Sequence, residues 1–290
     1  MSGHTQHDGI RRPVPVLMYH AVGHAPTEAA FELSVSPEAF AEQMNLISEY
    51  GGTPLTTAEL GHAWRTGGTL PDRPVLVTFD DGYEGVHRHA LPVLRRHGFG
   101  ASLFVSTGWL RGQYDNGKAL DTMLDWDQVR ELAAQGVEIG GHSHTHPQLD
   151  QLDDEVLAYE IERCRELVAA ETGVKPVSFA YPYGYSSRRV RQAVRSGGFD
   201  QALAVNNALA GGSQGPYALT RLTVRRSTDA AEFRRLIEGR GIGRNFARDQ
   251  VLTKGYAVLR RSRGALRAVR QFTASGDGNR QHRNRGTQST

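Results

Sequence analysis

Short hydrophobic runs rich in β-branched residues alternate with longer amphipathic stretches between about Pro13 and Leu236. This alternation is typical of βα units and predicts an α/β fold built on a parallel sheet or barrel. Seven runs are predicted to be strands, a number that suits a barrel-like domain. They are Val14–Tyr19, Val75–Phe79, Ser102–Ser106, Val137–Gly140, Val177–Tyr181, Gln201–Val205 and Thr220–Val224.

Two amphipathic stretches carry clear helix signals. Pro37–Tyr50 begins with proline after Ser36, a residue type that caps helix N-termini, and its apolar residues recur at helical spacing. A second helix is predicted over Asp154–Glu171, where Gly173 ends it. Cys164 lies on the apolar face of this second stretch, so we predict a core residue and not a reactive thiol.

The length and composition set broad limits. With 290 residues, 39% of them hydrophobic, the chain can bury one large core, and its single cysteine allows no internal disulfide and no cysteine-based zinc cluster. No apolar run approaches the roughly 18 residues that span a bilayer, and Met1 to Pro15 contains no apolar segment typical of a secretory signal. We therefore expect a soluble, cytoplasmic protein. The polar stretch Leu110–Leu124 is predicted to be a loop that could border a substrate groove.

The formal net charge of +3 hides an uneven distribution. Residues 240–290 contain 12 basic and two acidic side chains, whereas the first 239 residues contain 22 basic and 29 acidic ones. A nucleic-acid binder should carry its basic surface across the folded domain, so this split argues against a nucleic-acid partner. We predict a flexible N-terminus (1–12), a folded catalytic body (13–239), a basic amphipathic helical extension (240–272) and a disordered tail (273–290). The basic part could contact an anionic membrane surface or an anionic glycan, which would make the protein membrane-peripheral.

Two adjacent carboxylates, Asp80 and Asp81, follow the predicted strand Val75–Phe79 and precede Gly82. In parallel α/β folds, functional sites are assembled at the carboxyl ends of the strands. Two carboxylates side by side repel each other unless a cation or a hydrogen-bond network compensates them. The pair alone therefore fits a metal site and an ordinary Asx turn before glycine equally well.

Three histidines, His142, His144 and His146, occur within five residues directly after the predicted strand Val137–Gly140. The four-residue spacing would let His142 and His146 present ring nitrogens to the same point from one helical turn, with His144 pointing away. A surface histidine run is the alternative. With one aspartate of the earlier pair, these histidines predict a two-His, one-carboxylate metal site that leaves positions open for water and substrate.

These motifs resemble those of the polysaccharide deacetylase family, the NodB-homology domain of carbohydrate esterase family 4. The Thr-Phe-Asp-Asp-Gly strand end, the Gly-His-Ser-x-x-His element and the later segment Phe179–Gly184 occur in the family's order. The resemblance covers about Pro13 to Gly239. It implies a NodB-like distorted (β/α) barrel that hydrolyses N-acetyl or O-acetyl groups on sugars.

The resemblance also implies a role for each motif residue. Asp81, His142 and His146 would bind one divalent metal ion, zinc in the first place, with cobalt, manganese and nickel as alternatives. Asp80 would be the general base that takes a proton from water. The backbone N–H of Tyr183 would stabilise the oxyanion, and Tyr183 is also a candidate for contact with the substrate.

The sequence departs from the family's familiar pattern at two positions. Ala180 stands where many members have an arginine that holds the base, and no histidine follows His146 within the domain to act as the usual general acid. His20, at the end of the first predicted strand, is the candidate acid, as in the branch of the family that includes poly-N-acetylglucosamine deacetylases. A structural histidine is the alternative. Arg221, at the start of the last predicted strand, is the candidate partner of the base and a further candidate for substrate binding.

We therefore expect a metal-dependent hydrolase that removes acetyl groups, above all N-acetyl groups, from a sugar in a polysaccharide or glycan precursor. Two alternatives stay open: a hydrolase of a small-molecule amide on the same scaffold, and a non-catalytic glycan-binding relative. The retained Asp80 beside a full set of metal ligands argues against the second alternative.

Overall fold

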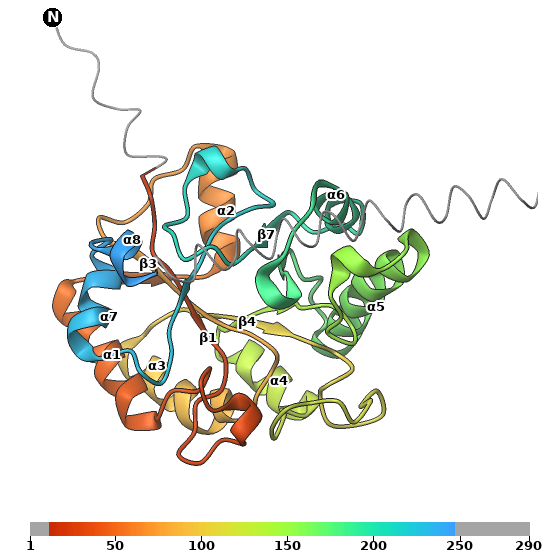
Figure 1. Ribbon diagram of the computed structural model, residues 1–290, viewed down its shortest axis with the longest axis horizontal. Coiled ribbons are helices and arrows are strands. Elements are labelled where there is room, and N and C mark those ends of the chain that lie inside the picture. Colours follow the sequence, from red (N-terminus) through yellow and green to blue (C-terminus); the bar gives the residue numbers. More distant parts are fainter. Residues whose placement is uncertain (1–11, 247–290) are drawn as a thin grey trace, which may run out of the picture. The chain divides into compact units, whose positions relative to one another are not determined.

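The computed structural model describes residues 12–246, which form a curled parallel β-sheet with helices packed around it (Figure 1). Seven strands pair in the order β7-β6-β5-β4-β3-β1-β8, and β2 pairs with the first residues of β3. Every strand pair is parallel, so the predicted α/β class and parallel sheet of about seven strands are confirmed. The strands are β1 (Val16–Tyr19), β2 (Thr53–Leu55), β3 (Pro74–Phe79), β4 (Ser102–Val105), β5 (Glu138–Gly141), β6 (Ser178–Ala180), β7 (Gln201–Leu203) and β8 (Leu222–Thr223).

The sheet curls into a half-barrel. Its two outer strands, β7 and β8, come together at one place, which is called the seam below. Leu203, the last residue of β7, forms a parallel bridge with Leu219, which lies just before β8. Two backbone hydrogen bonds hold this seam: Leu219 N–H donates to the carbonyl of Ala202, and Ala204 N–H donates to the carbonyl of Leu219. Residues at the ends of β1, β3, β5 and β6 therefore face a common edge.

Helices follow most strands, as expected for βα units. They are α1 (Pro37–Tyr50), α2 (Thr57–Thr66), α3 (Leu91–His97), α4 (Trp126–Ala134), α5 (Asp154–Thr172), α6 (Arg188–Ser196), α7 (Ala230–Ile237) and α8 (Ile242–Asn245). Shorter helical turns occupy Glu28–Ala30, Val86–Ala90, Leu149–Gln151, Pro182–Gly184 and Gly212–Gln214.

The two helices predicted from capping signals are confirmed. The Ser36 side chain accepts the N–H of Ala39 at the start of α1, and Gly51 ends the helix with a φ of 70°, which glycine adopts without strain. Gly173 ends α5 in the same left-handed conformation. Cys164 is fully buried, and burial raises the pKa of its thiol to about 12, so the prediction of a core residue is confirmed.

The structure contains one strand and one helix that the sequence pattern did not predict. β2 and α2 were not among the predicted elements; β2 is three residues long and half-exposed, too short to show an alternating pattern. The stretch Leu110–Leu124 contains no helix or strand, as predicted. Most of the predicted extension (240–272) and all of the predicted tail (273–290) lie outside the described residues. Between residues 12 and 246, no helix combines the length and the apolar character needed to cross a bilayer.

Candidate metal centre and active site

The first part of the site lies where the neighbouring strands β1 and β3 end. Tyr19 and Phe79 are register partners, and the N–H of Asp80 donates to the carbonyl of Tyr19 at 3.0 Å. Because the strands are parallel, His20 and Asp80 leave the sheet at the same level on adjacent strands. The sheet register thus brings together two candidate residues that are 60 positions apart in the chain.

Asp81, His142 and His146 converge on one point next to Asp80. The Oδ1 atom of Asp81 lies 3.2 Å from Nε2 of His142 and 3.3 Å from Nε2 of His146. The three ligand-type atoms lie within 4.8 Å of one another, and this is the one such group found among residues 12–246. Asp81 and His142 are buried, and His146 is largely buried.

A hydrogen bond orients His142 toward this point. Its Nδ1 atom lies 2.8 Å from the carbonyl oxygen of Ala180, which can only accept, so Nδ1 must carry the hydrogen. Nε2 of the neutral ring then keeps a free lone pair, and it faces Asp81. Metal-ligating histidines commonly donate their other nitrogen to a carbonyl in this way.

The three residues fit a divalent cation. Oδ1 of Asp81 is buried and, within the described part of the chain, accepts no hydrogen bond, although buried polar atoms normally have a partner. A cation between the two imidazole nitrogens and the carboxylate oxygen would bind all three atoms. Ligand atoms bound at about 2.0–2.1 Å to one tetrahedral ion lie about 3.3–3.4 Å apart, which agrees with both separations from Oδ1.

The segment from His142 to His146 is a loop, so the predicted helical turn was wrong. Ser143 and His146 adopt left-handed conformations with φ angles of 67° and 58°, and Ser143 Oγ accepts the N–H of His146 at 3.1 Å. These chain reversals, and not helical periodicity, bring the rings of His142 and His146 to a centroid separation of 5.0 Å. His144 points away, as predicted, and its Nδ1 lies 2.9 Å from Oγ1 of Thr107.

Glu160 of α5 holds this loop in place. Its carboxylate accepts the N–H of His144 (2.9 Å), the N–H of Thr145 (2.7 Å) and the hydroxyl of Thr145 (2.6 Å). The sequence analysis missed this residue, although a signal existed. Glu160 lies on the apolar face of α5 with Leu157 and Cys164, and a charged residue on a buried helix face needs partners.

Arg221 pairs with Asp80, as predicted. Its two terminal nitrogens donate to the two carboxylate oxygens of Asp80 at 2.6 and 2.7 Å, and both side chains are buried. Burial alone would raise the pKa of Asp80, but its neighbours, above all the charge of Arg221, outweigh burial and lower it. Because Arg221 is fully buried and both its terminal nitrogens face Asp80, it does not present a free side chain to a substrate.

His20 lies in the same electrostatic environment. Burial lowers the pKa of its imidazole, and this effect exceeds the opposing attraction of Asp81 and Asp80. Its Nδ1 atom is buried and has no hydrogen-bond partner among the described residues. A titratable ring with an unused nitrogen thus lies beside the two carboxylates.

Two aromatic rings flank His146. Tyr183, on the turn Pro182–Gly184, places its ring centroid 4.8 Å from that of His146 and is 53% exposed. Trp109 packs on His146 with a centroid separation of 4.4 Å. Tyr183 has a left-handed φ of 60°, so the turn directs its side chain outward over the site. Sequence reasoning missed Trp109, because nothing in the local pattern links it to a histidine 37 positions away.

Comparisons with known proteins agree with this architecture. The family model described as "Polysaccharide deacetylase" matches residues 67–202. YxkH of Bacillus subtilis (strain 168) is 26% identical over 227 residues, which are 78% of this chain and 76% of that protein. Poly-beta-1,6-N-acetyl-D-glucosamine N-deacetylase of Escherichia coli (strain K12) is 27% identical over 68% of this chain, and the match spans about a third (34%) of that enzyme.

The fold has a counterpart among solved structures. The structure of Streptococcus pyogenes deacetylase PplD in complex with acetate superposes with a TM-score of 0.71 at 23% identity and covers 78% of this chain and 99% of that one. The family match runs from the end of α2 into β7. It includes the aspartate pair, Asp80 and Asp81, and the histidine loop, His142 to His146. This match and the relatives above place residues 67–202 of the chain in the polysaccharide deacetylase family.

Proposed function

We propose that this protein is a metal-dependent deacetylase that removes acetyl groups, above all N-acetyl groups, from a sugar in a polysaccharide or glycan precursor. One observation carries the proposal: the metal-type cluster of Asp81, His142 and His146 lies directly beside a separate carboxylate, Asp80, that Arg221 holds in place. A site that only bound a metal would have no use for the second buried carboxylate.

Asp81, His142 and His146 would hold the ion, which we propose to be zinc or a similar divalent metal. Such an ion, when bound, polarises the acetyl carbonyl and lowers the pKa of an attacking water. The donor set of two imidazoles and one carboxylate occurs in catalytic zinc sites, where further positions stay open.

Asp80 is the proposed general base. Its lowered pKa keeps the carboxylate ionised at neutral pH, so it can accept a proton from the attacking water. The two hydrogen bonds from Arg221 fix its orientation, which we assign as the role of this arginine. Arg221 is fully buried, so we do not assign it a contact with the substrate.

His20 and Tyr183 complete the proposed reaction. When the C–N bond breaks, the leaving nitrogen needs a proton, and His20 on the neighbouring strand is the group proposed to deliver it. The backbone N–H of Tyr183 would stabilise the oxyanion, and its exposed ring would contact the sugar. The products are acetate and a free amine.

The substrate class rests on family membership. The E. coli relative is named for the N-deacetylation of poly-beta-1,6-N-acetyl-D-glucosamine, which makes oligomers of N-acetylglucosamine the first substrates to test. Small acetylated amides form the second arm of the test, because the scaffold alone does not select the substrate.

Asp80→Asn tests the proposed general base, whereas His142→Ala and His146→Ala test the proposed metal ligands. We expect Asp80→Asn to retain one metal ion per chain and to lose turnover by at least about 10²-fold, because a general base contributes about 10²–10⁴-fold. His142→Ala and His146→Ala should lose the metal itself. Metal content is measured by atomic emission, and products are measured by mass spectrometry after incubation with acetylated oligosaccharides and small amides. Purified protein without metal, or activity that is indifferent to chelators, would overturn the proposal.

A further inference from the structure

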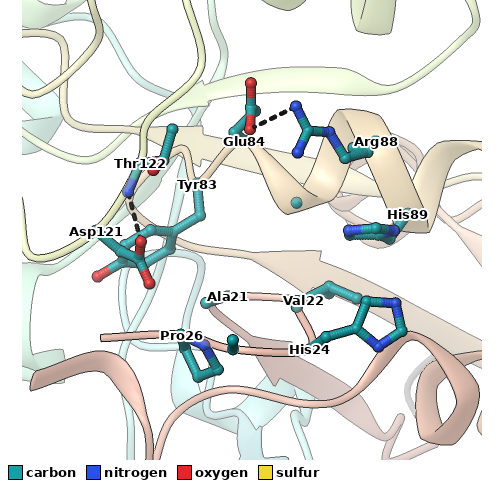
Figure 2. Close-up of a pocket in the computed structure, with 13 residues that line it drawn as sticks. Ala21, Val22, His24, Pro26, Tyr83, Glu84, Arg88, His89, Asp121 and Thr122 are labelled. Carbon is teal, nitrogen blue, oxygen red and sulfur yellow. Dashed lines mark hydrogen bonds and ion pairs between the residues drawn. The ribbon is translucent and has the colours of Figure 1, made fainter. Parts of the chain in front are cut away.

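A pocket lies next to the segments that carry the proposed active-site residues His20, Asp80 and Asp81 (Figure 2). It has a volume of about 250 Å³ and is lined by three segments: residues 21–26 after β1, residues 83–85, 88 and 89 after β3, and residues 121–122 of the long loop before α4. Ala21 directly follows His20, and Tyr83 lies two positions after Asp81. The two segments that carry His20 and Asp80–Asp81 therefore also supply residues of the pocket wall.

The pocket walls are tied to one another. Thr27 donates its N–H to Oδ2 of Asp121 (2.9 Å) and its hydroxyl to the carbonyl of Leu120 (2.6 Å), and Glu84 N–H donates to the carbonyl of Thr122 (3.0 Å). Gly85 lies so close to Val22 that an added Cβ atom would stand 1.8 Å from its carbonyl oxygen. The hollow is thus pre-formed and does not depend on a ligand to assemble it.

Polar groups dominate the lining. Glu84 pairs with Arg88 at 3.2 Å and with Arg111 at 3.5 Å, so its charge is compensated. The imidazoles of His24 and His89 meet edge to face at one side of the pocket, 5.4 Å apart (Figure 2). Hydrogen-bond donors and hydrogen-bond acceptors therefore both surround the hollow.

This lining narrows the class of ligand. The carboxylate of Asp121 disfavours an anion, and an apolar ligand would leave the surrounding polar groups without partners. His24, His89 and the nearby Glu38 do not bring three ligand atoms together as the Asp81 cluster does. Pockets for drug-sized ligands measure about 300–1,000 Å³, so 250 Å³ suits something smaller, of the size of one sugar ring. Hydroxyl groups match the mixture of carboxylate, guanidinium and imidazole.

We propose that this pocket binds a neighbouring, uncharged sugar residue of the glycan chain, adjacent to the residue that carries the acetyl group. The inference rests on the proposed function and sharpens it, because it requires a substrate of at least two linked sugars. Arg88 and His89 are the side chains that would hydrogen-bond the hydroxyls of this second sugar.

The test compares a long substrate with one too small to reach the pocket. The metal-loaded His89→Ala and Arg88→Ala variants are assayed on a pentamer of β-1,6-linked N-acetylglucosamine and on 4-nitrophenyl acetate. Loss of one hydrogen-bonding side chain should raise KM for the pentamer about 2- to 10-fold. Hydrolysis of 4-nitrophenyl acetate should change less than about two-fold, because that probe does not extend into the pocket.

Matched controls remove the same side chains elsewhere. His62→Ala on α2 and Arg95→Ala on α3 delete an exposed imidazole and an exposed guanidinium outside the pocket, and both should behave as wild type on both substrates. Equal loss of activity on the pentamer and the small ester, or an unchanged KM for the pentamer in both pocket variants, would overturn the pocket assignment.

A binding measurement separates failure of the pocket from failure of the proposed function. Calorimetric titration of the pentamer into metal-loaded Asp80→Asn protein should give a dissociation constant that His89→Ala and Arg88→Ala each raise about 2- to 10-fold. Binding that neither variant weakens rejects the pocket alone. A third outcome would reject the glycan function and the pocket together. In that outcome, wild type does not turn over the pentamer and Asp80→Asn does not bind it, although wild type still hydrolyses 4-nitrophenyl acetate.

Discussion

Asp80 and Asp81 are adjacent in the chain but have different partners. Asp81 adopts a left-handed φ of 73°, which turns its carboxylate toward the two histidines, whereas Asp80 faces Arg221. The backbone reversal thus separates two like charges that would otherwise repel each other in a buried site. At the scale of single residues, Arg221 compensates the charge of Asp80, whereas Asp81 faces His142 and His146.

Arg221→Met should destabilise the fold strongly, because it leaves the Asp80 carboxylate buried without a partner. Breaking a buried ion pair in this way costs about 3–5 kcal/mol, and denaturant titration of the metal-free protein measures the loss. Arg234→Met, which removes the exposed pair with Glu49, is the control and should cost less than about 1 kcal/mol. Adding Asp80→Asn to Arg221→Met should recover part of the stability. Similar losses for Arg221→Met and Arg234→Met would contradict the prediction.

At the scale of elements, helix α5 positions a loop that it does not contain. The histidine loop carries two left-handed residues, and its conformation is held from outside by the Glu160 carboxylate. The strand β6 contributes in a similar way, since its Ala180 carbonyl accepts the Nδ1 hydrogen of His142. The two proposed histidine ligands thus depend on neighbouring elements for their orientation.

Glu160→Gln should weaken metal binding without removing a ligand. The variant loses the charged acceptor that orders the loop, and outer partners of metal ligands typically contribute about 10–100-fold in affinity. Competition with a chelating indicator measures the dissociation constant. Glu162→Gln, on the exposed side of the same helix, is the matched control and should bind metal as wild type does. A Glu160→Gln protein with unchanged affinity would show that the loop holds its shape by itself.

At the scale of the whole molecule, the two ends of the parallel strands carry different groups of polar residues. The carboxyl ends of the strands carry the proposed site, whereas the amino ends carry a buried polar network around Glu138, the first residue of β5. Its carboxylate accepts the N–H of Ala58 (2.9 Å) and the hydroxyls of Ser102 (2.7 Å) and Ser178. This network joins the start of α2 to the starts of β4, β5 and β6.

Glu138 should make the stability of the fold depend on pH. Burial raises the pKa of its carboxyl, and the hydrogen bonds that it accepts only partly oppose this. The folded state therefore holds the proton more tightly than the unfolded state, and the contribution of Glu138 to stability falls as pH rises from its unfolded pKa of about 4.3 toward the raised folded value. Unfolding free energies of wild type and Glu138→Gln, measured between pH 4 and 7, should show wild type losing stability relative to the variant as pH increases. The opposite slope would contradict the direction of the pKa shift.

The local features of the site were predictable from the chain itself. The strand that precedes Asp80 and Asp81 is an apolar run bounded by proline and glycine, and the three histidines follow another such run. Hydrophobic periodicity and turn residues act over a few positions, so they identify these elements and the edge at which the candidate residues emerge. The pairing of Arg221 with Asp80 was predicted by position in a barrel and is present.

Other features were decided only by the tertiary structure. Periodicity along the chain says nothing of the left-handed residues that turn the histidine loop, the buried carboxylate that holds it, or Trp109 against His146. These contacts join residues from different elements, and they depend on sheet register and packing, which no local pattern encodes. The sequence by itself therefore determined the fold class and the residue types of the site. Tertiary packing decided how those residues face one another, and it formed the neighbouring pocket from three segments that are far apart in the chain.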